Sequence, residues 1–131
     1  MASSVTETPP TYCTVGINKL ILDVTFDTDG SFTSTALTHK IDGFLLALET
    51  NPGSPAPTDN YDITLIDEEG LDVLQGNGVD RDTTNTEMVA IDLDGYFHPP
   101  VTRDQTLTLT ISGNTINSAT VRIIIYYEKV E

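Results

Sequence analysis

The chain has 131 residues, of which 38% are hydrophobic and none is Trp, so it can bury one core of ordinary size. Its 20 acidic and 6 basic residues give a formal net charge of −14, which disfavours free nucleic acid and anionic membranes as partners. Cys13 is the only cysteine and excludes an intrachain disulfide. Residues 1–10 have no basic region and no apolar run, so we expect no signal peptide. No apolar stretch approaches the roughly 20 residues that span a bilayer.

The N-terminal segment, residues 1–14, is polar and contains Pro9 and Pro10. Adjacent prolines favour an extended, polyproline-like backbone, and few of these side chains could contribute to a core. We therefore predict an extended N-terminal arm over residues 1–14 and one β-sandwich domain over residues 15–131. Two interpretations of the arm stay open: a loose tail, and an arm that becomes ordered on a neighbouring subunit.

From residue 17 onward, apolar and polar residues alternate in short runs that are separated by turn residues, as in β-strands. The segment 41–48, IDGFLLAL, contains a continuous apolar run, which fits either a strand covered on both faces or a short buried helix. Several prolines between residues 49 and 60 predict an unpaired connection there. The predicted strands are residues 17–26, 31–38, 41–48, 61–67, 71–75, 87–93, 105–112 and 119–127.

The last predicted strand has the clearest alternation. Its opposite, outward face carries Ile124 and Tyr126 next to Arg122. Apolar residues on both faces of a strand indicate a sheet that is covered on both sides. The second cover would come from another subunit or from a second layer of the same sandwich. The inward set that the alternation predicts is Val121, Ile123, Ile125 and Tyr127.

About eight short strands, with no convincing amphipathic helix between them, indicate an all-β fold. Parallel sheets are excluded because they need crossover connections, usually helices. We predict an antiparallel β-sandwich with a jelly-roll-like topology, preceded by the extended arm. An immunoglobulin-like sandwich ranks second, because the chain lacks the Cys–Trp–Cys core of a true immunoglobulin domain.

The sequence offers little for catalysis or metal binding. His39 and His98 lie in different predicted loops, and neither belongs to a pair with ligand spacing. The single cysteine has no neighbouring base, and no serine lies in a nucleophile elbow. Residues 27–31, DTDGS, begin like a calcium loop, but Phe32 and Thr38 occupy the positions of its glycine and glutamate. We predict no catalytic, cofactor or metal site and interpret the Asp-rich segments as turns.

Two segments resemble small virion proteins of tailed bacteriophages. They are residues 61–87, YDITLIDEEGLDVLQGNGVDRDTTNTE, and residues 107–127, LTLTISGNTINSATVRIIIYY. Over residues 17–127 the layout is similar to that of phage capsid decoration, or cement, proteins. The resemblance implies a non-enzymatic β-sandwich that works without a cofactor as a homo-oligomer, a dimer or trimer. It would be made in the host cytoplasm, sit on the outer capsid surface of the virion and bridge its partner, the major capsid protein.

The candidate contacts with the major capsid protein come from the arm, the polar loop and the outward face of the last strand. They are Thr8, Pro9, Pro10, Thr11, Tyr12, Asp80, Arg81, Asp82, Ile124 and Tyr126. One alternative is another virion component, such as a head–tail connector or a tail-associated β-domain. A second is a calcium- or carbohydrate-binding β-module. A third is an enzyme with a hidden carboxylate pair, such as Asp27 and Asp29.

Overall fold

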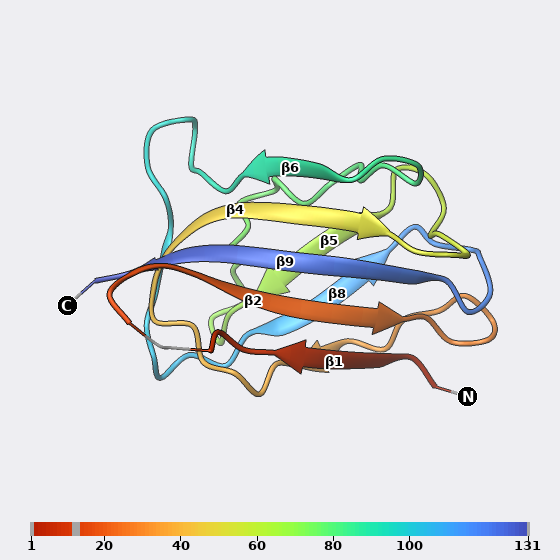
Figure 1. The fold of residues 1–131 in the computed structure, drawn as a ribbon, viewed down its shortest axis with the longest axis horizontal. Helices are drawn as coiled ribbons and strands as arrows, with labels where there is room; N and C mark the ends of the chain where they lie inside the picture. The colour runs from red at the N-terminus through yellow and green to blue at the C-terminus, as the bar shows by residue number, and fades with distance from the viewer. Residues whose placement is uncertain (1, 12–13, 131) are drawn as a thin grey trace.

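The protein forms two β-sheets that pack face to face, as the computed structural model shows for residues 2–11 and 14–130 (Figure 1). Within these residues all regular structure is β, so there is no long apolar helix that could cross a bilayer. The described strands are β1 (Ser4–Thr8), β2 (Gly16–Thr25), β3 (Thr35–Ala36), β4 (Gly43–Pro52), β5 (Asp62–Ile66), β6 (Glu87–Ala90), β7 (Pro100–Val101), β8 (Thr108–Ser112) and β9 (Thr120–Lys129).

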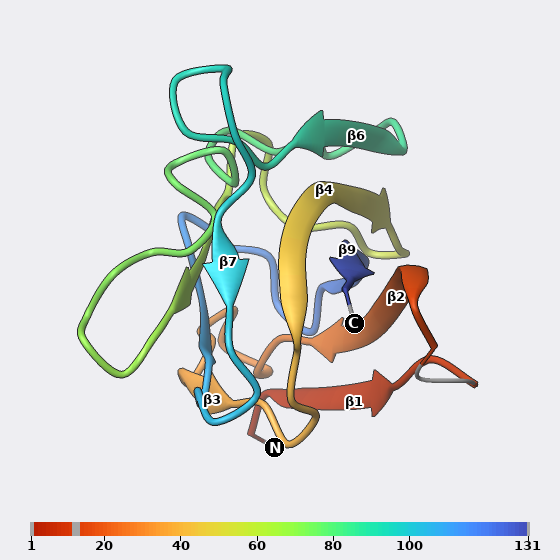
Figure 2. The ribbon, with the colours of Figure 1, turned by 90° about the vertical axis from the view of Figure 1, so that its left-hand side faces the viewer.

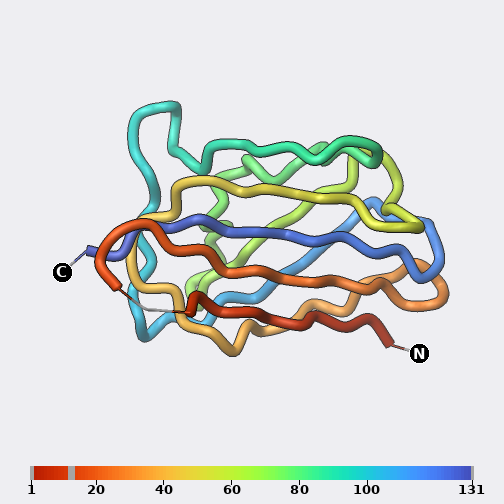
Figure 3. The backbone as a smooth tube through the Cα atoms, viewed as in Figure 1, coloured from red at the N-terminus to blue at the C-terminus, as the bar shows by residue number. Residues whose placement is uncertain are grey.

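The two sheets are wound as a jelly roll. The larger sheet has the order β1-β2-β9-β4-β6, with β7 also paired to β4, and the smaller sheet has the order β3-β8-β5. From β2 to β6 successive strands alternate between the sheets, and they do so again from β7 to β9, as the backbone trace shows (Figure 3). All these strand pairs are antiparallel. The predicted antiparallel, jelly-roll-like sandwich is therefore confirmed.

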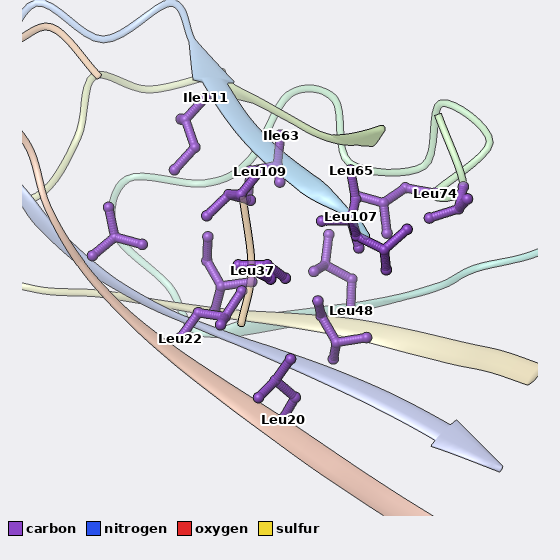
Figure 4. Packing of buried hydrophobic residues seen from close by; sticks show 14 of the residues in the cluster. Leu20, Leu22, Leu37, Leu48, Ile63, Leu65, Leu74, Leu107, Leu109 and Ile111 are labelled. Carbon is purple, nitrogen blue, oxygen red and sulfur yellow. The ribbon is translucent and has the colours of Figure 1, made fainter. Parts of the chain in front are cut away.

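Side chains from both sheets meet in one apolar core. Figure 4 shows Leu20, Leu22 and Leu48 of the larger sheet facing Leu65 and Leu109 of the smaller one, all fully buried. Burial of each such leucine stabilises the fold by about 1.5–3 kcal/mol, so this layer dominates the stability. The predicted inward face of the last strand is also confirmed, because β9 buries Val121, Ile123, Ile125 and Tyr127.

Residues 71–75 do not form the predicted strand; most of them form a turn. The carboxylate of Asp72 fixes this turn, because it accepts the backbone N–H groups of Leu65, Leu74 and Gly76 at 3.0–3.1 Å. A side chain that binds nearby backbone groups in this way competes with the ladder of a sheet. Leu74 still enters the core, and the segment pairs with β5 only at one isolated bridge between Asp72 and Ile66, so its apolar pattern mainly reflects burial.

The structure decides between the two interpretations of the segment 41–48, because residues 43–48 lie in the strand β4 and not in a helix. A bulge between Leu45 and Ala47 interrupts the alternation, which explains the successive apolar residues 44–48. The strand also continues to Pro52, into the predicted unpaired connection. Proline is tolerated there because β6 accompanies β4 only as far as Thr50, which leaves Pro52 at a local edge.

Within the N-terminal segment, residues 4–8 are extended and form β1 along β2 at the edge of the larger sheet. The side chain of Glu7 ties β1 to the loop that follows β3. Its two carboxylate oxygens accept the backbone N–H groups of Thr38 and His39 at 2.7 and 2.8 Å. The first part of the predicted arm thus belongs to the sandwich in this structure.

The predicted strand 31–38 is shorter than expected and pairs with β8 only at β3. Before β3 the N–H of Thr33 donates to Ser3 Oγ at 2.9 Å. Thr35 Oγ1 in turn donates to the Thr33 carbonyl at 2.8 Å. Because hydroxyl side chains take up these backbone groups, the ladder with β8 stays short.

Candidate interaction surfaces

The outer face of the larger sheet is a broad surface that faces the viewer in Figure 1, with no other strand in front of it. Ile124 points outward as predicted, but it is only 8% exposed because Ile21 of β2 and Glu49 of β4 flank it in register. Tyr126 is half-buried and donates its hydroxyl to Glu49 Oε1 at 2.9 Å, and this hydrogen bond raises the pKa of Tyr126. Neighbouring side chains therefore cover most of Ile124.

Three other apolar side chains on this face are more exposed and are not among the predicted contacts. They are Ile17 of β2, Phe44 of β4 and Met88 of β6, with exposed fractions of 71%, 39% and 58%. Glu128 of β9 lies in register between Ile17 and Phe44, which places those two residues about 10 Å apart across three strands. Period-two alternation could have placed Ile17 outward. The bulge in β4 and the shortness of β6 hide the outward direction of Phe44 and Met88.

Arg81 of the predicted loop contact is part of the sandwich framework. It pairs with Tyr61 in an isolated antiparallel bridge, with the Arg81 N–H donating to the Tyr61 carbonyl at 2.8 Å. Its guanidinium lies 3.2 Å from Glu87 Oε1, and only 11% of the Arg81 side chain is exposed. This geometry stabilises the loop and leaves little of Arg81 for a partner.

The Asp82 side chain also forms hydrogen bonds within the loop itself. Its Oδ1 accepts the backbone N–H groups of Thr84 and Asn85 at 2.6 and 3.1 Å. These hydrogen bonds, the one from Thr84 first, lower the pKa of the Asp82 carboxyl. Asp80 is exposed, with a positive φ of 56°. Of the three predicted loop residues, Asp80 is therefore the most accessible.

The predicted arm contacts lie at the other end of the sandwich from this loop. Thr8 is the last residue of β1, and Pro9 lines a shallow pocket with Glu7 and His39. Thr11 is exposed and Pro10 is half-buried. The fifth arm contact, Tyr12, lies outside the described residues, as does the only cysteine.

The acidic turns show local hydrogen bonding of a structural kind. Asp29 Oδ1 accepts from the N–H and the hydroxyl of Ser31 at 2.9 and 2.6 Å, which lowers the pKa of Asp29. The segment that begins like a calcium loop is thus an Asx-type turn. His98 Nδ1 lies 2.6 Å from the Ile91 carbonyl oxygen. In the parts of the chain that the structure describes, no three His, Cys, Asp or Glu side chains are placed to share a metal ion.

Tyr61 is a fully buried aromatic residue whose hydroxyl lies near that of Thr50 in the core. The two hydroxyls interact, but neither has a hydrogen-bond partner in favourable geometry among the described residues. Burial raises the pKa of Tyr61 to about 12. This polar pair is enclosed by the sandwich and does not reach any outer surface.

The predicted contacts fall into three separate places: the centre of the outer sheet face, one end of the sandwich and the opposite end. They do not converge on a single cleft. No family model, curated protein or solved structure matches the chain. The function has to be inferred from the chemistry of the surfaces themselves.

Proposed function

We propose that the protein is a non-enzymatic virion component of a tailed phage, which binds the outside of the capsid, bridges major capsid proteins and stabilises the shell. The sequence resemblance over residues 17–127 supports this proposal. The jelly-roll sandwich agrees with the subunit architecture that the resemblance implies. Its broad, uncovered sheet face suits a subunit that lies against a larger surface.

The exposed apolar side chains of this face are the main structural support for the proposal. Ile17, Phe44 and Met88 stand on three strands of one sheet, among polar and charged neighbours such as Lys19 and Glu128. Exposed apolar groups with a polar rim are typical of protein–protein contacts. The net charge of −14 complements a basic capsid surface and keeps the protein away from packaged nucleic acid.

Stabilisation would follow from mass action. A protein that binds the assembled shell, and not the dissociated capsid subunits, shifts the equilibrium towards the shell. The gain per site is about 2.7 kcal/mol when the free protein is at 100 times its Kd. A dimer or trimer adds to this gain, because its second contact forms at a high effective concentration.

The first test is light scattering of the purified protein, with and without emptied capsids of the parent phage, followed by co-sedimentation. We expect a stable dimer or trimer that sediments with the capsids. A monomer that does not sediment with capsids would contradict the proposal and would favour a tail component or a ligand-binding module.

A double variant, Phe44→Ser with Met88→Ser, tests the outer face directly. Loss of two apolar anchors should weaken capsid binding roughly tenfold or more. Tyr96→Ser is the matched control, because Tyr96 is 89% exposed in the turn between β6 and β7. It removes an exposed aromatic ring from another part of the surface and should leave binding unchanged. Equal losses in both variants would contradict an outer-face contact.

A further inference from the structure

Positive charge in this acidic protein is concentrated at one end of the sandwich. Of the six Lys and Arg residues in the chain, three line one open pocket of about 390 Å³. The pocket is lined by His39, Lys40, Asp42, Arg103, Tyr127 and Lys129. Half of the cations of a chain with a net charge of −14 therefore surround a single concavity.

Three segments that are distant in sequence build this pocket, at the end of the sandwich that faces the viewer in Figure 2. The loop between β3 and β4 supplies Lys40 and His39, the residues after β7 supply Arg103, and the end of β9 supplies Lys129. Two contacts hold His39 in place: its backbone N–H donates to Glu7 Oε1 at 2.8 Å, and its Nε2 lies 3.3 Å from the Tyr127 hydroxyl. The pocket is therefore built at the ends of paired strands.

Two of these cations, Arg103 and Lys40, retain donors for a ligand. Arg103 Nη2 lies 2.9 Å from Asp42 Oδ2, which uses one of five guanidinium N–H donors, and 73% of the Arg103 side chain is exposed. Lys40 Nζ donates to the Gln105 carbonyl at 3.3 Å and to Thr106 Oγ1 at 2.6 Å, which leaves one of its three donors. Among the described residues that line the pocket, Asp42 is the only carboxylate against three cations.

We propose that this pocket binds a small multivalent oxyanion of the phosphate or polycarboxylate class. Ammonium and guanidinium groups recognise such anions through charge-assisted hydrogen bonds. The pocket volume lies at the lower end of the range of small-molecule sites, which fits an anion of a few heavy atoms. Two further carboxylates lie near the pocket and weaken anion binding: Glu7, which accepts the His39 N–H, and Asp104, which interacts electrostatically with Lys40. More distant carboxylates oppose binding only weakly at physiological salt, because the Debye length is then about 8 Å.

An NMR titration of the full, ¹⁵N-labelled chain tests the proposal. Inorganic phosphate and citrate are added separately, at a constant ionic strength of about 0.15 M set with sodium chloride. We expect saturable shifts of the backbone amides in residues 39–42 and 102–104, with the outer sheet face unchanged. The two titrations distinguish phosphate from carboxylate recognition. If neither anion produces saturable shifts at this end of the sandwich, the proposal is wrong.

Charge-matched variants separate a specific site from a response to net charge. Lys40→Gln and Arg103→Gln should each raise the Kd for the bound anion about tenfold, as expected for loss of one charge-assisted hydrogen bond. Lys19→Gln removes the same charge from the outer sheet face, where Lys19 is exposed, and should leave the Kd unchanged. Equal weakening by Lys19→Gln would overturn the proposal. If Lys40→Gln disturbs the amide spectrum of the free protein, Arg103→Gln alone is compared with Lys19→Gln, because Arg103 is exposed.

Discussion

Replacing Gly43 with alanine tests the closest approach between β4 and β9. Gly43 has a φ of +150°, and a Cβ at this position would lie 2.0 Å from the Glu128 carbonyl oxygen, against 3.4–4 Å for an ordinary contact. Gly43→Ala therefore combines an unfavourable backbone conformation with a clash. The clash involves the backbone of β9, so a side-chain rotation cannot relieve it. The two strands must move apart at this end of the sheet.

Two other glycines separate the two effects. Gly16 has a φ of +113° with no atom within 4 Å of an added Cβ, so Gly16→Ala carries only the backbone effect, roughly 1–3 kcal/mol. At Gly78 the φ is not in the positive region, but the Cβ would lie 2.2 Å from the Ile63 carbonyl oxygen. Gly78→Ala should therefore cost roughly 1–3 kcal/mol through overpacking alone. For Gly43→Ala we expect both effects together, roughly 2–6 kcal/mol.

The assay is urea unfolding followed by far-UV circular dichroism, because the chain has no Trp for fluorescence. Midpoints and slopes give the free energy of unfolding of each variant. We expect Gly43→Ala to be less stable than both Gly16→Ala and Gly78→Ala. If Gly43→Ala unfolds at the same urea concentration as Gly16→Ala, the Glu128 carbonyl does not approach Gly43 closely. The register described for the start of β4 would then be wrong.

Tyr61 should ionise above the other tyrosines in an alkaline absorbance titration, because burial raises its pKa from 10.0 to about 12. The stabilisation linked to this shift is complete below pH 10 and is lost as the pH rises through about 12, and Tyr61→Phe should abolish that dependence. Arg81→Met should lower the free energy of unfolding by about 1–3 kcal/mol, because it leaves the Glu87 carboxylate without its cationic partner at a largely buried site. Arg122→Met breaks an exposed ion pair and should have much less effect in the same urea assay; equal losses would contradict the role of burial.

The sequence was sufficient for strands that have one buried and one open face. β9 is the clearest example, because Val121 and Ile123 alternate with the exposed Arg122, although the outward Ile124 further along the strand is buried as well. The edge strand β1 gave no such signal, since Val5 is its only apolar residue and is only half-buried. Asp72 shows a different limit, because its side chain binds nearby backbone groups and reduces the predicted strand to a single bridge with Ile66.

The surroundings of the candidate contacts could not be predicted from one sequence. The outward direction of Ile124 follows from alternation, but its cover by Ile21 and Glu49 depends on the strand order β2-β9-β4. The ion pair of Arg81 with Glu87 similarly needs a loop to fold back on the strand that follows it. The cationic pocket could not be predicted from the sequence for the same reason, because three distant segments contribute to it.

β9 lies in the middle of the larger sheet, between β2 and β4, although it follows both of them by a long stretch of chain. During synthesis on the ribosome, β2 and β4 therefore emerge long before the strand that joins them. Until then both have unpaired backbone edges and uncovered apolar faces, which are prone to pair with other chains. The sandwich closes only when β9 becomes available, and a nascent chain that stops before Thr120 presents two open sheet edges instead of a smaller stable domain.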